Sequence, residues 1–222
     1  MNKYKVCVYA ISKNEEKFAK RWYESVKSAD GIYVLDTGST DNTVKILKEL
    51  GAKVTTKEIK PWRFDIARNE SLKLVPLDAD ICVCIDIDEV ISPNWREKLE
   101  EILENEKVNH VRYIYNWSHD ENKNPKVSFY YEKIHARKNF KWVNPVHEVL
   151  KYTGSNEVWA TTNDIIVDHY PDSSKSRSSY LPLLELSVKE DPYNDRNVHY
   201  LGREYMYYGK LNEAIDTLIY HL

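Results

Sequence analysis

The chain has 222 residues, with 32 lysines and arginines against 35 aspartates and glutamates, a formal net charge of −3 and 42% hydrophobic residues. These values are typical of one compact domain with a small appendage. Acidic and basic residues are interspersed along the chain, so the sequence does not predict the basic surface that sequence-independent nucleic-acid binding needs. No run approaches the roughly 18 to 20 consecutive apolar residues of a membrane-spanning helix, and residues 1–4 do not open a signal peptide, so we expect a cytoplasmic location, or a peripheral one at the inner face of the membrane.

In the first half, short runs rich in β-branched and aromatic residues alternate with helical patterns. This order predicts an α/β fold with a mostly parallel central sheet flanked by helices. The expected strands cover residues 4–11, 30–36, 52–57 and 80–87. The expected helices cover 14–28, a segment that starts within 40–43 and stops at Gly51, a segment after 64, and 94–105. Cys7, Cys82 and Cys84 fall inside strand runs, so we expect buried thiols and neither a disulfide nor a zinc site.

The second half has a different pattern. Residues 108–169 read as β-rich segments broken by polar loops, and the chain turns helical again from about 173. The spacing of Leu201, Gly202, Tyr205, Ala214 and Leu218 resembles a tetratricopeptide repeat, with an ordinary helical hairpin as the alternative. We therefore predict a domain over residues 1–171 and a helical segment over 172–222, and expect the natural chain to continue beyond Leu222.

An apolar run at 81–85 ends abruptly in three acidic residues, Asp86, Asp88 and Glu89. Removing so many acids from water requires a compensating partner. In an open α/β sheet, ligands collect beyond the carboxyl ends of the strands, where acids can hold a hard divalent cation that in turn binds a diphosphate. The alternative is a solvated, acidic strand-to-loop junction.

A second strand run ends at Asp36, and residues 37–43 (TGSTDNT) follow it. Asp36 can accept hydrogen bonds from a base or ribose, and Gly38 permits a tight exit from the strand. The same residues also fit a simple turn and helix cap.

Residues 11–16, 36–43, 64–70 and 86–89 occur in an order and spacing that resemble family 2 glycosyltransferases, over roughly residues 4–170. The resemblance implies a GT-A fold, a nucleotide-sugar donor that is usually a UDP-sugar, a bound Mn²⁺ or Mg²⁺, and transfer with inversion at the anomeric carbon. The helical tail resembles the branch of this family that carries repeats.

The resemblance also implies a role for each matching residue. Ser12 and Glu15 would form one wall of the nucleotide site, and Asp36 would meet the base. Arg68 would reach uracil or phosphate, and Asp86 and Asp88 would bind ribose, metal and diphosphate.

Inverting transfer needs a base for the acceptor proton. Glu148, in a His-Glu element that resembles the repeat-bearing branch, is the predicted base, and Asp120 is the reserve. His169 is a predicted ligand of the metal or diphosphate. The alternatives are an ordinary ion-paired carboxylate for Glu148 and a hydrogen-bonded structural role for His169.

Other predictions concern the surroundings of this site. His135 and Arg137 are candidates to face the diphosphate, and Trp117 and Trp142 are candidate walls of an acceptor site. The acceptor could be a saccharide, a lipid-linked saccharide or a peptide, and the helical segment could form a homodimer.

Two competing interpretations remain open from the sequence. Residues 86–90 also fit the Asp-x-Asp element of haloacid-dehalogenase-type phosphatases, with Asp86 as nucleophile and Asp88 as acid/base. The chain could also be a non-catalytic, repeat-containing adaptor with a residual nucleotide-sugar site. Trapping a phosphoenzyme at Asp86 would favour the first, and failure to bind or turn over any donor would favour the second.

Overall fold

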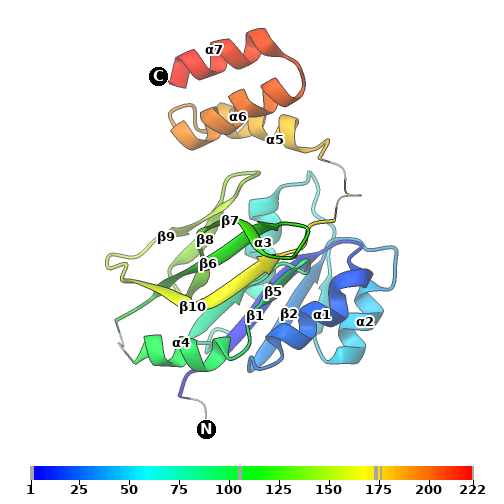
Figure 1. Cartoon of the computed structure of the whole chain (residues 1–222), viewed down its shortest axis with the longest axis vertical. Helices are drawn as coiled ribbons and strands as arrows, with labels where there is room; N and C mark the ends of the chain where they lie inside the picture. The colour runs from blue at the N-terminus through cyan, green and yellow to red at the C-terminus, as the bar shows by residue number, and fades with distance from the viewer. Residues whose placement is uncertain (1–2, 105–106, 173–174, 176, 222) are drawn as a thin grey trace.

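A computed structural model describes residues 3–104, 107–172, 175 and 177–221 (Figure 1). Within these residues the main element is an eight-stranded sheet, accompanied by a two-stranded sheet. The strand order of the large sheet is β3 (Lys53–Thr56), β2 (Gly31–Asp36), β1 (Val6–Ser12), β4 (Ile81–Cys84), β7 (Pro125–Ala136), β6 (His110–His119), β10 (Trp159–His169) and β5 (Glu89–Ile91).

The sheet is mixed. Strands β3, β2, β1 and β4 pair in parallel, and β6 pairs in parallel with β10. The pairs β4–β7, β6–β7 and β10–β5 are antiparallel. The expected α/β architecture is confirmed, and the predicted parallel core corresponds to the first four strands.

Helices cover both faces of this sheet. Successive residues of β1 point to opposite faces, so Val6 and Val8 pack on one side while Cys7 and Tyr9 pack on the other. Helices α1 (Glu16–Val26), α2 (Thr43–Leu50) and α4 (Trp95–Leu103) cover the first face. Helix α3 (Phe64–Leu74) and the small sheet of β8 (Phe140–Val143) and β9 (Val149–Tyr152) cover the second.

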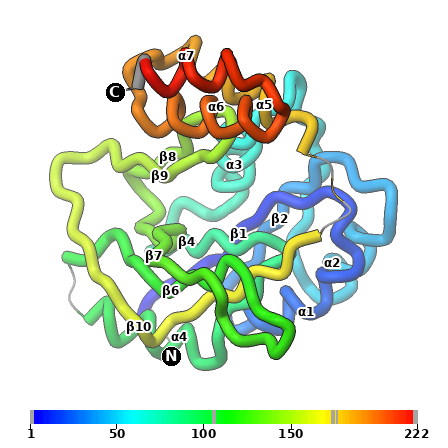
Figure 2. Tube along the Cα trace, turned by 45° about the horizontal axis from the view of Figure 1, so that its top comes forward, coloured from blue at the N-terminus to red at the C-terminus, as the bar shows by residue number. Residues whose placement is uncertain are grey.

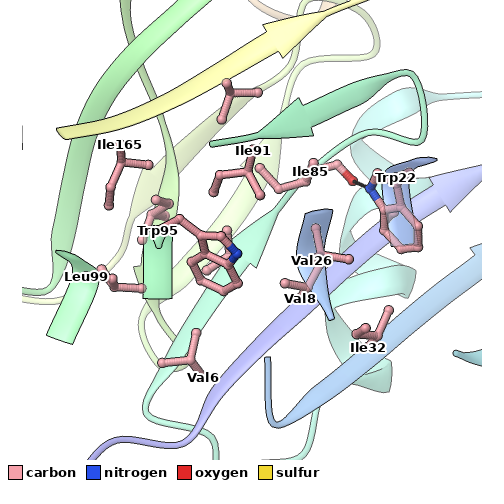
Figure 3. Packing of buried hydrophobic residues seen from close by; sticks show 14 of the residues in the cluster. Val6, Val8, Trp22, Val26, Ile32, Ile85, Ile91, Trp95, Leu99 and Ile165 are labelled. Carbon is pink, nitrogen blue, oxygen red and sulfur yellow. Dashed lines mark hydrogen bonds between the residues drawn. The ribbon is translucent and has the colours of Figure 1, made fainter. Parts of the chain in front are cut away.

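The packing on the first face anchors the start of residues 86–89, which carry the three acids after β4 and are called the acidic loop below (Figure 3). Trp22 of α1 is fully buried, and its indole N–H donates a 3.1 Å hydrogen bond to the carbonyl of Ile85. Ile85 is itself buried and directly precedes Asp86. The core therefore fixes the point at which the chain leaves β4.

Three helices follow β10 and form a layer at one end of the molecule (Figure 2). They are α5 (Tyr180–Glu190), α6 (Asp195–Tyr207) and α7 (Leu211–His221). Leu184 of α5 and Leu201 of α6 pack with Val146, which lies in the loop between β8 and β9. The helical layer thus contacts the segment that carries Glu148.

Helices α6 and α7 form the expected helical hairpin. A Cβ atom on Gly202 would lie 2.6 Å from the side chain of Leu218, so glycine permits the close approach of the two helices. One hairpin does not establish a repeat, so the tetratricopeptide assignment and the domain boundary after residue 171 stay predictions.

Candidate active site

The carboxyl ends of β1 and β2 meet where the sequence predicts a nucleotide site. Ser12 and Asp36 are paired in the sheet register, and the Ser12 hydroxyl donates to Asp36 Oδ2 at 3.1 Å. Asp36 is fully buried and also accepts from the backbone N–H groups of Gly38 and Ser39, at 3.1 and 3.0 Å. Its carboxylate therefore stabilises the turn, which was the alternative to a nucleotide site for these residues. Contact of Asp36 with the nucleobase of a donor stays a prediction.

Arg68 links the two most important predicted acids. From the buried side of α3, its terminal nitrogens donate to both oxygens of Asp86, and its Nε donates to Glu148 Oε1 at 2.9 Å. Burial alone would lower the pKa of Arg68, but the charges of Asp86 and Glu148 raise it well above its ordinary value. Three predicted site residues from distant segments thus form one ion-paired cluster.

Lys133 is a member of this cluster that sequence reasoning missed. It lies on β7 with a side chain only 2% exposed, and its Nζ contacts Glu89 at 2.7 and 2.8 Å and Asp86 Oδ2 at 3.1 Å. Burial alone would raise the pKa of Asp86, but Arg68 and Lys133 together hold it below its ordinary value. The available signal was a lysine at an inward-facing position of a strand, since alternation places it with Tyr131 and His135.

The predicted metal ligands are only partly assembled. His169 Nε2 lies 3.4 Å from Asp88 Oδ2, and His169 Nδ1 donates to the Trp117 carbonyl at 3.1 Å, which leaves Nε2 available as a ligand. Burial alone would lower the pKa of His169, but Asp88 raises it above its ordinary value. Asp86 is turned toward Arg68 and Lys133. Among the described residues, no three His, Cys, Asp or Glu side chains converge as a metal site, so the predicted set does not fit a cation as the side chains stand.

Glu15 lies between β1 and α1, at the start of the helix, and is ion-paired with Lys175. It is 7% exposed, and its Oε2 has no hydrogen-bond partner in the described part of the chain. Burial raises the pKa of Glu15 to about 7, with Lys175 opposing the rise and Asp88 and Asp86 adding to it.

Several predicted residues lie elsewhere. Asp120 is at the exposed tip of the β6–β7 hairpin, where its carboxylate accepts from the backbone N–H groups of Asn122 and Asn124. Arg137 donates to the Val75 carbonyl. These contacts stabilise turns and loops, so the structure brings neither residue to the Asp86 cluster.

Two aromatic predictions are also corrected. His135 is fully buried and accepts a 2.8 Å hydrogen bond from the Tyr9 hydroxyl, and burial lowers its pKa to about 3, so it does not face a diphosphate. Trp142 is 3% exposed and lies beneath the Arg68 guanidinium, 5.3 Å away, so it supports Arg68 and does not form an acceptor wall. Trp117, by contrast, is 51% exposed.

The mixed eight-stranded sheet with helices on both faces is an α/β fold of the GT-A type. Residues 7–151 match the model of the family described as glycosyl transferase family 2, and the chain belongs to this family. Uncharacterized glycosyltransferases of Rickettsia typhi and Rickettsia conorii are 35% and 34% identical over 111 residues, which is 50% of this chain and 36% and 37% of theirs. The matched region is thus about a third of the length of these relatives.

Among solved structures, a mycobacterial protein has a TM-score of 0.51 with 16% identity, over 82% of this chain and 71% of its own. Glucosyl-3-phosphoglycerate synthase from Mycobacterium tuberculosis, in complex with Mn²⁺ and UDP-glucose, has a TM-score of 0.41 with 23% identity, over 51% and 44%. The first similarity supports the fold alone, and the second is too slight to assign ligands to this chain. None of the helices within the described residues is long and apolar enough to cross a membrane.

Proposed function

We propose that the chain is an inverting glycosyltransferase that moves a sugar from a UDP-sugar to an acceptor, with Glu148 as the base. One observation carries this proposal: in a family 2 domain, Arg68 holds Glu148 and Asp86 on a single guanidinium. A donor-binding acid and a base must lie close together, because the acceptor has to approach the sugar carbon while the diphosphate is held.

The mechanism assigns the proton to Glu148. Its Oε1 accepts from Arg68, and Oε2 has no partner within the described residues, so Oε2 is available to an acceptor hydroxyl. The proton passes to this carboxylate while the acceptor oxygen bonds to the anomeric carbon. The bond from that carbon to the diphosphate oxygen breaks, and its electron pair leaves with UDP.

Dependence on Mn²⁺ or Mg²⁺ stays a sequence-based prediction. Asp88 and His169 adjoin each other, but Asp86 is committed to Arg68 and Lys133. We therefore assign no step of the mechanism to the cation.

The acceptor is proposed to lie along the β6–β7 side of the site. The rings of Tyr115, Phe129 and Tyr131 pack together with centroids 5.0 to 5.9 Å apart, and His169 stacks on Tyr115 at 6.0 Å. The half-exposed Trp117 follows on β6. Tyr115 is only 5% exposed, so the rings open to an acceptor are those of Phe129 and Trp117, which are 44% and 51% exposed. Exposed aromatic faces can pack against sugar rings, which supports a saccharide among the three predicted acceptor classes.

Release of UDP from a panel of UDP-sugars, with Mn²⁺ or Mg²⁺, tests the proposal. The wild type should release UDP slowly, and Asp88→Asn should abolish the release. Asp78→Asn is the matched control, because Asp78 is 73% exposed and ion-paired with Lys5, before the amino end of β1. Equal activity of the wild type and Asp88→Asn would refute the proposed site.

The same panel separates the competing interpretations. A chain that neither binds nor turns over any donor would favour the adaptor, and a phosphoenzyme attached to Asp86 would favour the phosphatase. A homodimer through the helical segment stays a prediction that sedimentation analysis tests, and the predicted cytoplasmic or peripheral location can be tested by cell fractionation.

A further inference from the structure

Lys133 is a buried charge to which the proposed mechanism gives no task. It lies on β7, which pairs antiparallel with β4 immediately before the acidic loop. Its ammonium contacts both oxygens of Glu89 and one oxygen of Asp86. Because the side chain is only 2% exposed, it cannot reach a substrate.

Glu89 closes the acidic loop on itself. Its backbone N–H donates to the Asp86 carbonyl at 2.9 Å, and its Oε2 accepts from the Asp86 N–H at 2.8 Å. Glu89 is 1% exposed, so its charge depends on a partner in the protein interior, and Lys133 is that partner. An unbroken series of polar contacts therefore runs from Lys133 through Glu89 to the backbone of Asp86.

We infer that Lys133 is a positioning residue: through Glu89 and by its own contact with Asp86, it fixes the conformation of residues 86–89. The link from this conformation to donor binding rests on the proposed function, whereas the link to loop conformation does not. Groups that orient a ligand-binding carboxylate typically change ligand affinity about 10- to 100-fold when they are removed.

The first test measures hydrogen exchange of the loop in Lys133→Met, which removes the ammonium with little change in side-chain length. Exchange at the Asp86 and Glu89 amides should be at least about tenfold faster than in the wild type, relative to amides of β1. Arg96→Met is the matched control, because Arg96 is a 4% exposed cation on α4 bonded to Asp30, Glu100 and the Tyr4 carbonyl.

A purely structural role predicts that both variants accelerate exchange throughout the protein. Wild-type exchange of the loop in a folded Lys133→Met variant, or equal acceleration in Arg96→Met, would overturn the inference.

Should Lys133→Met not fold, the double variant Lys133→Met/Glu89→Gln decides instead. It leaves no unpaired buried charge, and the carbonyl of the introduced side-chain amide can still accept from the Asp86 N–H, so only the anchor from β7 is lost. The loop should again exchange faster than in the wild type, and a wild-type rate would overturn the inference.

The second test measures UDP binding with Mn²⁺ by calorimetry. Lys133→Met should bind about 10- to 100-fold more weakly, and Arg96→Met should match the wild type. Unchanged affinity in Lys133→Met would refute the positioning role in donor binding. A wild type that binds no UDP would instead refute the proposed function, while the exchange measurement would still decide whether Lys133 fixes the loop.

Discussion

Glu15 makes the stability of the protein depend on pH in a way that one substitution should remove. Its carboxyl is buried before α1, and burial raises its pKa from 4.5 to about 7, against the opposing effect of Lys175. At about 1.4 kcal/mol per pH unit, the interval between these values corresponds to at most about 3.5 kcal/mol of unfolding free energy.

The sign follows from where the proton is held. Below the unfolded pKa, Glu15 is protonated in both states and costs nothing. Between 4.5 and about 7 the folded state keeps the proton that the unfolded state has lost, so stability falls as pH rises through this interval. Above it the cost is constant, because the folded protein then carries a buried carboxylate.

Glu15→Gln removes the charge and nearly preserves the shape. The variant should match the wild type near about pH 4 and exceed its melting temperature by up to about 7 to 14 °C near about pH 8, since about 1 kcal/mol shifts the melting temperature of a protein of this size by about 2 to 4 °C. Thermal melts across this pH range measure the difference. Glu49→Gln is the control, because Glu49 is exposed on α2. A Glu15→Gln effect of equal size at both ends of the range would refute the reasoning.

Four further predictions concern catalysis. Glu148→Gln should keep UDP affinity but lower turnover about 10²- to 10⁴-fold. The control Glu132→Gln alters a more exposed ion pair with Arg112 and should keep wild-type turnover. Wild-type turnover in Glu148→Gln would show that Glu148 is not the base. Asp120→Asn should leave turnover unchanged because its carboxylate closes a hairpin turn, and a large loss would restore it as the base. The metal dependence that the family resemblance implies requires that EDTA stops UDP release and that Mn²⁺ or Mg²⁺ restores it, whereas full activity in EDTA would agree with the lack of a converged ligand set among the described residues and would exclude metal dependence. Trp117→Ala should raise the acceptor KM more than it lowers kcat, and an unchanged KM would place the acceptor elsewhere.

The first half of the fold could be predicted because its signals are local. The expected strand at 30–36 is β2, and the helix expected to start within residues 40–43 and to stop at Gly51 is α2. Gly51 ends that helix with φ 110°, as a glycine stop requires. Parallel strands of this kind place their carboxyl ends at one edge, and Ser12 and Asp36, which the family resemblance assigned to one nucleotide site, lie side by side there.

The second half could not be predicted to the same depth because its pairings are non-local. Nothing near Pro125–Ala136 indicates that β7 lies between β4 and β6, and that placement brings Lys133 to Asp86. The same pairing buries His135 in the core. Strand alternation alone could say which residues share a face, but not whether that face was solvent, core or site.

The acids at the strand ends therefore have a different explanation from the one that their sequence favours. Their burial demands compensating charge, which pointed to a metal ion. In the structure the compensation comes from side chains, because each acid has a cationic or titratable partner. These pairs are Asp86 with Arg68 and Lys133, Glu89 with Lys133, Glu148 with Arg68, Glu15 with Lys175, and Asp88 with His169. If a donor and its cation bind at this edge, as we propose, they must replace some of these pairs. The contact between Asp88 and His169 is the first that we expect to break, because at 3.4 Å it is the longest of these pairs.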